Sequence, residues 1–146
     1  MEIMKSVVGP SSPKTSNLAL LLLRVGIGLV FMRLGYGIIA GGPAMWAQLG
    51  AMMGNLGIHF WVSFWGLCAG IIEFAGGLSL VLGLFVRKWV VSMAFVMVVA
   101  VIYHAKHGDP WTVLSYPLAM LFVFLALLLL GSGRYSLDAL IYGKLK

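Results

Sequence analysis

The residues most able to do chemistry in this chain are a few charged side chains inside long apolar segments. Glu73 stands near the middle of one such segment, and Arg24 and Arg33 stand in another. An ionised carboxylate is expensive to bury in apolar surroundings, so Glu73 needs a proton or a cationic partner. Small residues such as Gly70 and Gly77 share its helical face, so we predict that Glu73 points into the bundle rather than at lipid. Two roles are open for it. It either forms a buried ion pair that fixes helix register, or it handles protons or polarises a ligand.

The two arginines are the candidate partners of Glu73. Arg24 and Arg33 are nine residues apart, which puts them on nearly opposite faces of a helix at about 100° per residue. If the two segments are antiparallel helices, both arginines lie within roughly 6–8 Å of Glu73 measured along the helix axes. A long arginine side chain can span that distance. We therefore predict that one of them pairs with Glu73, and we favour Arg24. Arg33 is then expected to extend toward the membrane surface or to bind an anionic group there.

Three histidines, His59, His104 and His107, fall at the ends of apolar segments. The spacing of His104 and His107 puts both rings on one helical face, and Asp109 follows closely. Imidazole nitrogens bind metals and haem, and they hydrogen-bond to quinone carbonyls. The alternative is that polar residues simply collect at a membrane interface. No zinc or haem motif is present, so we predict no metal site, and His104 stays a candidate ligand contact.

Cys68 is the single cysteine of the chain. The chain therefore cannot form an internal disulfide or carry out dithiol exchange by itself. The neighbours of Cys68 are small or apolar, which favours a packing role. Together with the lack of any cofactor motif, this means that we do not expect catalysis by the chain alone.

Long apolar segments must position all of these residues. Hydrophobic residues make up 62% of the chain and charged residues 10%, and the mean hydropathy is +1.04. A soluble domain of 146 residues could not hide so much apolar surface. A helix needs about 20 apolar residues to cross the hydrocarbon core. The sequence therefore predicts an all-α, four-helix transmembrane bundle, with spans at about 18–40, 60–86, 89–104 and 112–130.

The segments outside the spans are short. Pro43 begins an amphipathic stretch that predicts a short interfacial helix between spans one and two. The first span lacks a small-residue cleavage pattern, so we interpret it as a retained helix rather than a signal peptide. Residues 1–17 and 139–146 are interpreted as tails, which leaves residues 18–138 as one membrane domain.

The basic residues indicate the orientation of the chain in the membrane. Cytoplasmic connections are enriched in Lys and Arg. These residues precede span one, join spans two and three, and follow span four, whereas the other connections contain only Lys106. We therefore expect both termini in the cytoplasm, in a bacterial-type inner membrane. Anionic lipid then accounts for the formal net charge of +6, and a nucleic-acid partner is not expected.

Three segments in this order resemble the DoxX family of small membrane proteins. They are Leu22-Leu23-Arg24-Val25-Gly26-Ile27-Gly28, then Glu73-Phe74-Ala75-Gly76-Gly77 with Gly83-Leu84-Phe85-Val86-Arg87, and finally Gly131-Ser132-Gly133-Arg134-Tyr135-Ser136-Leu137-Asp138. The resemblance implies a four-helix bundle and a link to quinone-linked sulfur oxidation or oxidative-stress defence. The family often carries a His before the Gly near the end of span one. This chain has Leu34 before Gly35, so a role of that His is not carried over.

Three functions are open on these observations. The first is a redox-associated membrane subunit, quinone-linked or acting in oxidative stress, that holds a quinone or similar ligand near Glu73 or docks an oxidoreductase partner. The second is a small transporter or channel component in which Glu73, Arg24 and Arg33 form a polar path, which would require a homo-oligomer. The third is a structural assembly subunit without a ligand. The resemblance favours the first, with a quinone as the candidate cofactor.

Overall fold

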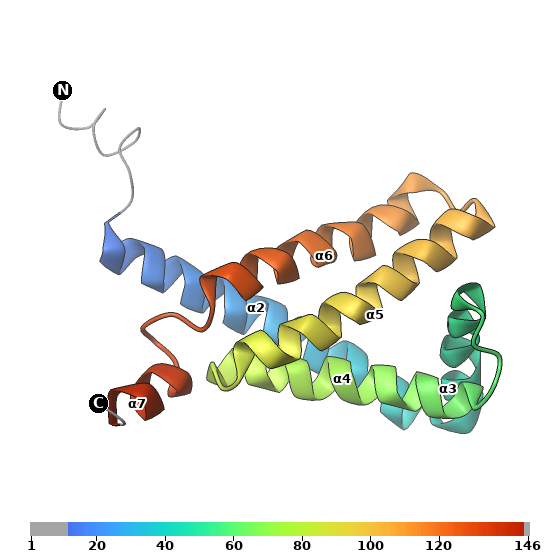
Figure 1. Ribbon diagram of the computed structural model, residues 1–146, viewed down its shortest axis with the longest axis horizontal. Coiled ribbons are helices and arrows are strands. Elements are labelled where there is room, and N and C mark those ends of the chain that lie inside the picture. Colours follow the sequence, from blue (N-terminus) through green and yellow to red (C-terminus); the bar gives the residue numbers. More distant parts are fainter. Residues whose placement is uncertain (1–11, 145–146) are drawn as a thin grey trace.

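The computed structural model describes residues 12–144, and this part of the chain is almost entirely helical (Figure 1). Its elements are α2 (Pro13–Ala40), α3 (Gly42–Gly50), the 3₁₀ helix η1 (Ala51–Leu56), α4 (Val62–Leu82), α5 (Val86–His107), α6 (Trp111–Leu130) and α7 (Leu137–Lys144). Four of them, α2, α4, α5 and α6, are long and apolar enough to cross a membrane. The predicted all-α fold, with four spans and a short helix between the first two, is confirmed.

The first span begins earlier than the sequence analysis predicted. The hydroxyl oxygen of Ser12 accepts a hydrogen bond from the Thr15 backbone nitrogen at 3.2 Å, and Pro13 occupies the first turn of α2. Both features are strong signals for a helix N-terminus. Residues 13–17, which were expected in a polar tail, therefore form the start of α2. The remainder of that predicted tail, residues 1–11, lies outside the described residues.

The third span is also longer than predicted, because a distant residue caps its start. The carboxylate of Asp138 accepts hydrogen bonds from the backbone nitrogens of Phe85, at 2.9 Å, and Val86, at 3.4 Å. α5 therefore begins at Val86, and it ends before Gly108, whose left-handed conformation is typical of a helix C-cap. Asp138 itself belongs to α7 (Leu137–Lys144). This helix includes residues 139–144, which were expected to form part of a C-terminal tail.

The long helices form two packed pairs, α2 with α4 and α5 with α6. Figure 1 shows the two pairs close together near α7 and spread apart at the opposite end, where α3 and η1 stand in the gap. We call the end near α7 the narrow end and the end near α3 the wide end. Both ends of the described chain lie at the narrow end (Figure 1).

Glycines allow α2 and α4 to pack with their backbones in contact. A Cβ atom added at Gly35 would overlap the backbone of Phe74, and one added at Gly28 would lie 2.6 Å from the carbonyl oxygen of Gly77. Such small-residue contacts are typical of membrane helix pairs. The glycine-rich face of span two is therefore used within the chain.

The hydrophobic core lies toward the narrow half of the molecule. The rings of Phe31 and Phe124 meet edge to face with centroids 5.1 Å apart. Around them pack fully buried side chains such as Leu80, Val90 and Leu127, which come from the narrow halves of α4, α5 and α6. The wide end contains few fully buried side chains by comparison.

The short helices close the wide end. The indole nitrogen of Trp46 in α3 donates a hydrogen bond to the carbonyl oxygen of Ile38 at 2.9 Å. A Cβ atom at Gly66 of α4 would overlap the backbone of Trp46, so α3 lies directly on α4. The ammonium of Lys106 donates to the carbonyl oxygen of Asn55 at 2.8 Å, which ties η1 to the end of α5.

Candidate ligand pocket

Arg24 does not pair with Glu73. Its side chain is 1% exposed, and its guanidinium donates hydrogen bonds to the carbonyl oxygens of Tyr135, at 2.5 Å, and Leu80, at 3.4 Å. Within residues 12–144 the only ion pair joins His104 to Asp109. The prediction of a Glu73–Arg24 pair is therefore wrong. It rested on depth and on the family resemblance around Arg24, and neither could include an acceptor supplied after the fourth span.

Parts of the three segments that resemble the DoxX family meet around Arg24 at the narrow end, namely Arg24 itself, Gly83 and Ser136. Gly83 has a φ of +69°, and a Cβ atom there would overlap the Arg24 guanidinium and the Ser136 side chain. Arg24 therefore joins α2 to the end of α4 and to the segment before α7, and this role is structural.

Arg33 lies on an exposed face of α2. Its Nη1 atom lies 3.4 Å from the position that a Cβ atom of Gly37 would occupy, one turn further toward the wide end. The missing side chain of Gly37 thus leaves room for the guanidinium to extend in that direction. No ion pair joins Arg33 to Glu73 within the described chain.

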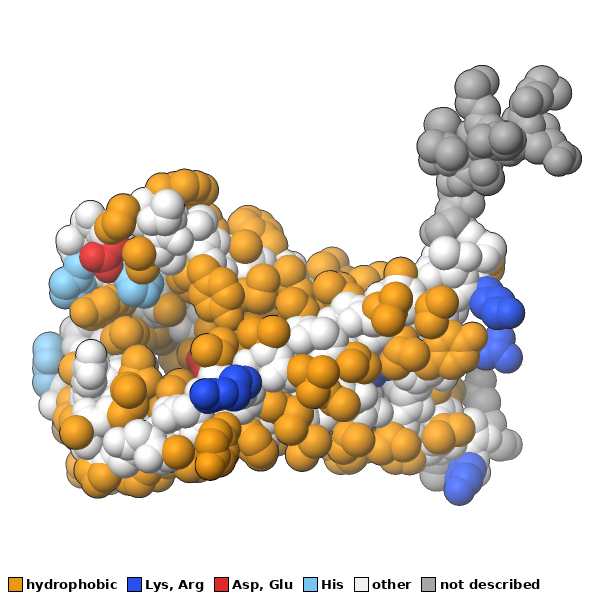
Figure 2. Space-filling model, turned by 180° about the vertical axis from the view of Figure 1, so that it is seen from behind, with side chains coloured by type: hydrophobic (Ala, Val, Ile, Leu, Met, Phe, Trp, Pro, Cys, Tyr) orange, Lys and Arg blue, Asp and Glu red, His pale blue; other side chains and the backbone are white. Residues whose placement is uncertain are grey.

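Glu73 faces the interior of the molecule, as its small-residue neighbours predicted, and is 8% exposed. It lines a mainly apolar pocket of about 640 Å³ between the two helix pairs at the wide end. Every element from α2 to α6 contributes to the walls of this pocket. Figure 2 shows the hollow at the wide end, beside the histidine side chains. The Glu73 carboxylate accepts no hydrogen bond from any described residue.

The other polar groups of the pocket come mainly from α6. Tyr116 and Thr112 line it. Pro117 lies inside α6 and has no backbone N–H, so the carbonyl oxygen of Val113 lacks its helical donor. These residues were not predicted to line a site. The available signal was a proline within an apolar span, which leaves a polar backbone group to be satisfied at membrane depth.

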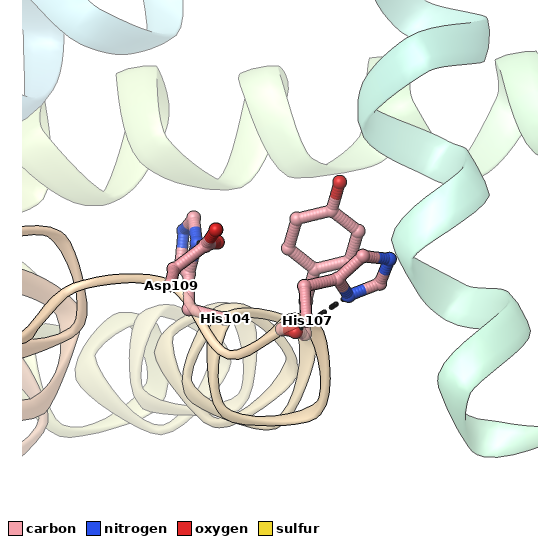
Figure 3. Close-up of polar contacts among 4 residues, drawn as sticks. His104, His107 and Asp109 are labelled. Atoms are coloured by element: carbon pink, nitrogen blue, oxygen red, sulfur yellow. Dashed lines mark hydrogen bonds and ion pairs between the residues drawn. The ribbon is translucent and has the colours of Figure 1, made fainter.

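The histidines are separate and do not form one site. His104 lines the pocket, and its Nδ1 atom lies 2.7 Å from the carboxylate of Asp109. His107 instead donates from Nδ1 to the carbonyl oxygen of Tyr103 at 2.8 Å, and Figure 3 shows its ring turned away from His104. His59 is exposed and lies beyond η1. Among the described residues, no three metal-ligating side chains come together.

Cys68 also lines the pocket and is partly buried. Its neighbours in the walls are apolar side chains such as Ile72 and Val96. The thiol is therefore part of the apolar wall on the side of α4 that carries Glu73.

The fold and the pocket define a class of protein: a small four-span helical membrane protein with a mainly apolar, ligand-sized cavity and one buried carboxylate inside it. The family model for DoxX matches residues 19–106, and the chain belongs to the DoxX family. The match includes Arg24, Glu73 and His104, whereas α6 and α7 lie beyond it. No curated protein and no solved structure matches the chain.

Proposed function

We propose that this chain is a redox-associated membrane subunit that binds a quinone, or a similar molecule with a polar head and an apolar tail, in the pocket around Glu73. The observation that carries the proposal is Glu73, a buried carboxylate without a hydrogen-bond partner in the described chain, facing a cavity of about 640 Å³. Apolar walls with a few convergent polar groups are typical of small-molecule sites. Membership of the DoxX family agrees with a quinone-linked role.

The polar groups of the pocket fit such a head group. The hydroxyls of Tyr116 and Thr112 are available to donate hydrogen bonds to carbonyl oxygens, and Glu73 holds or accepts a proton at its carboxylate. Apolar residues such as Ile38 and Phe95 surround the remaining volume, where a hydrocarbon tail would lie. A bound quinone would supply two-electron, two-proton chemistry. A partner oxidoreductase would deliver the electrons.

A transport function has less support. It needs a continuous polar path through Glu73, Arg24 and Arg33. Arg24 is bonded to backbone carbonyls at the narrow end, and Arg33 lies on an exposed face of α2. The glycine-rich face that could have joined copies of the chain is already used by the contact between α2 and α4. The three charged residues therefore occupy separate surroundings.

The test is quinone analysis of protein solubilised gently from a quinone-containing membrane. Wild-type protein should retain a quinone-type molecule in excess of the amount expected from carried-over lipid. Ala100→Phe places a large side chain on the pocket wall and should remove most of this excess. Ala119→Phe is the matched control because Ala119 is exposed on α6 outside the pocket. No excess in wild-type protein, or equal retention by both variants, would reject the proposal.

A further inference from the structure

A second pocket lies at the narrow end and shares no residue with the pocket around Glu73. Its volume is about 580 Å³, and it lies between the start of α5, the end of α6 and α7. Its walls combine apolar side chains, such as Leu130 and Ile141, with the basic side chains of Arg87 and Lys88. Figure 2 shows Lys and Arg side chains gathered at this end of the molecule.

The guanidinium of Arg87 is held in a fixed position with one edge free. Its Nε atom donates a hydrogen bond to the carbonyl oxygen of Leu128 at 3.2 Å, which orients the group between α5 and α6. Gly131 has a φ of +70°, and a Cβ atom there would lie 3.3 Å from both Nε and Nη2 of Arg87. The glycine thus provides the space for the guanidinium. The two Nη atoms have no hydrogen-bond acceptor among the described residues.

The other polar groups leave the pocket positively charged. The Nζ atom of Lys88 lies 5.2 Å from the ring centroid of Phe85, and Lys88 forms no ion pair with a described residue. The hydroxyl of Ser132 also lines the pocket. The one acidic residue in the walls, Asp138, already accepts hydrogen bonds from the backbone at the start of α5. A planar guanidinium, an ammonium and a hydroxyl are together a donor set suited to a phosphate group.

We propose that this pocket binds the phosphate of an anionic phospholipid of the bilayer. Arg87 and Lys88 contact the phosphate, and Leu130 and Ile141 contact the upper part of the acyl chains. The position favours a lipid over a free anion, because the pocket lies where the spans α5 and α6 meet the membrane surface. Next to it, Leu140 of α7 is 63% exposed and Ile141 47%, which is typical of a helix at the boundary between head groups and hydrocarbon.

The test measures lipid binding by native mass spectrometry of the purified full chain in a neutral detergent. The probes are dioleoyl phosphatidylglycerol, dioleoyl phosphatidylcholine and inorganic phosphate. We expect one tight phosphatidylglycerol site, with phosphatidylcholine at least about tenfold weaker. Both lipids carry an ionised phosphate, but the choline cation of phosphatidylcholine is repelled by Arg87 and Lys88. Inorganic phosphate should bind more weakly still because it lacks the apolar contacts.

Two variants locate the site. Arg87→Gln should weaken phosphatidylglycerol binding about tenfold, and Lys88→Gln about fivefold. Lys88→Gln leaves the bond between Arg87 and Leu128 intact, so it decides the matter if Arg87→Gln fails to fold. Arg134→Gln is the matched control, because it removes the same charge at the same end outside this pocket and should change binding by less than about twofold.

Three outcomes would overturn the assignment. Equal affinity for phosphatidylglycerol and phosphatidylcholine would show that the net charge of the lipid does not determine binding. Inorganic phosphate binding as tightly as phosphatidylglycerol would show a site for a free anion. Wild-type affinity in Lys88→Gln would place lipid binding elsewhere on the molecule if Arg87→Gln also has wild-type affinity or does not fold.

Discussion

Arg24 at the narrow end and Glu73 in the wide half are both charged, buried and set within spanning helices, yet their surroundings are opposite. Arg24 donates to two backbone carbonyls, and a glycine with a left-handed backbone makes room for it. Glu73 accepts no hydrogen bond from a described residue and faces a cavity. Burying a charge is costly unless it is bonded, so the bonds of Arg24 account for its burial within the fold, whereas the burial of Glu73 is what led us to propose a ligand there.

The largest effect should come from removing the bonded charge. Arg24→Leu strands the carbonyl oxygens of Tyr135 and Leu80 and should lower the free energy of unfolding by about 3–5 kcal/mol. Thermal or denaturant unfolding of the detergent-solubilised protein, followed by circular dichroism, measures this. Arg33→Leu is the control on the same helix and should change the free energy by less than about 1 kcal/mol, because Arg33 is exposed. Equal losses for the two variants would contradict the structural role of Arg24.

A backbone change at the narrow end should come next. Gly83→Ala introduces a Cβ atom at a φ of +69°, against the Arg24 guanidinium and Ser136, and should cost about 2–3 kcal/mol of stability. Gly26→Ala is the matched control, because a Cβ atom at Gly26 meets nothing within 4 Å. That control should be neutral or should stabilise the helix by up to about 1 kcal/mol. The same unfolding measurement applies, and a harmless Gly83→Ala would show that the narrow end is not tightly packed.

The unbonded charge should behave in the opposite way. Glu73→Gln removes a buried carboxylate without leaving any hydrogen-bond donor unpaired among the described residues. The free energy of unfolding should therefore change by less than about 1 kcal/mol. The amount of quinone retained should fall. In a double-mutant cycle with Arg24→Leu, the coupling energy for unfolding should lie within about 0.5 kcal/mol of zero, since the two residues share no contact. A coupling energy several times that size would support the ion pair between Glu73 and Arg24 after all.

The smallest effect is expected at the mouth of the pocket. The side chains of His104 and Asp109 are 20% and 34% exposed, so solvent weakens their interaction. Asp109→Asn should lower stability by less than about 1 kcal/mol. Lys106→Gln removes a neighbouring charged hydrogen bond to Asn55 and provides a comparison of similar size. A loss above 2 kcal/mol for Asp109→Asn, measured by the same unfolding assay, would mean that this pair fixes the wide end.

Hydropathy was enough to predict the four spans, because membrane thickness sets the length of an apolar helix. Small residues around Glu73 also predicted correctly that it faces inward, since such residues mark the contact surfaces of membrane helices. The partner of Arg24 could not be predicted in the same way. Depth and helical angle describe single helices, whereas its acceptor at Tyr135 depends on how the chain folds back after α6.

Of the four candidate ligand residues, Arg24, Arg33, Glu73 and His104, only Glu73 and His104 line the pocket. Its remaining polar wall depends on how α6 approaches α4, and nothing in the spacing of Tyr116 or Pro117 specifies that approach. The start of α5 was misplaced for a related reason. Its cap is Asp138, a residue far along the chain, whereas sequence rules for helix starts consider only neighbouring residues.

The bond from Arg24 to Tyr135 spans 111 positions of the chain, and this separation has a consequence for biosynthesis. At about 5–20 residues per second, roughly 6–22 s pass between the synthesis of the first partner and that of the second. All four spans, the last of which ends at Leu130, are therefore synthesised before the acceptor at Tyr135 exists. Closure of the narrow end is then a late step of membrane assembly, and a chain truncated before residue 135 would insert its helices without the bond that ties α2 to the segment before α7.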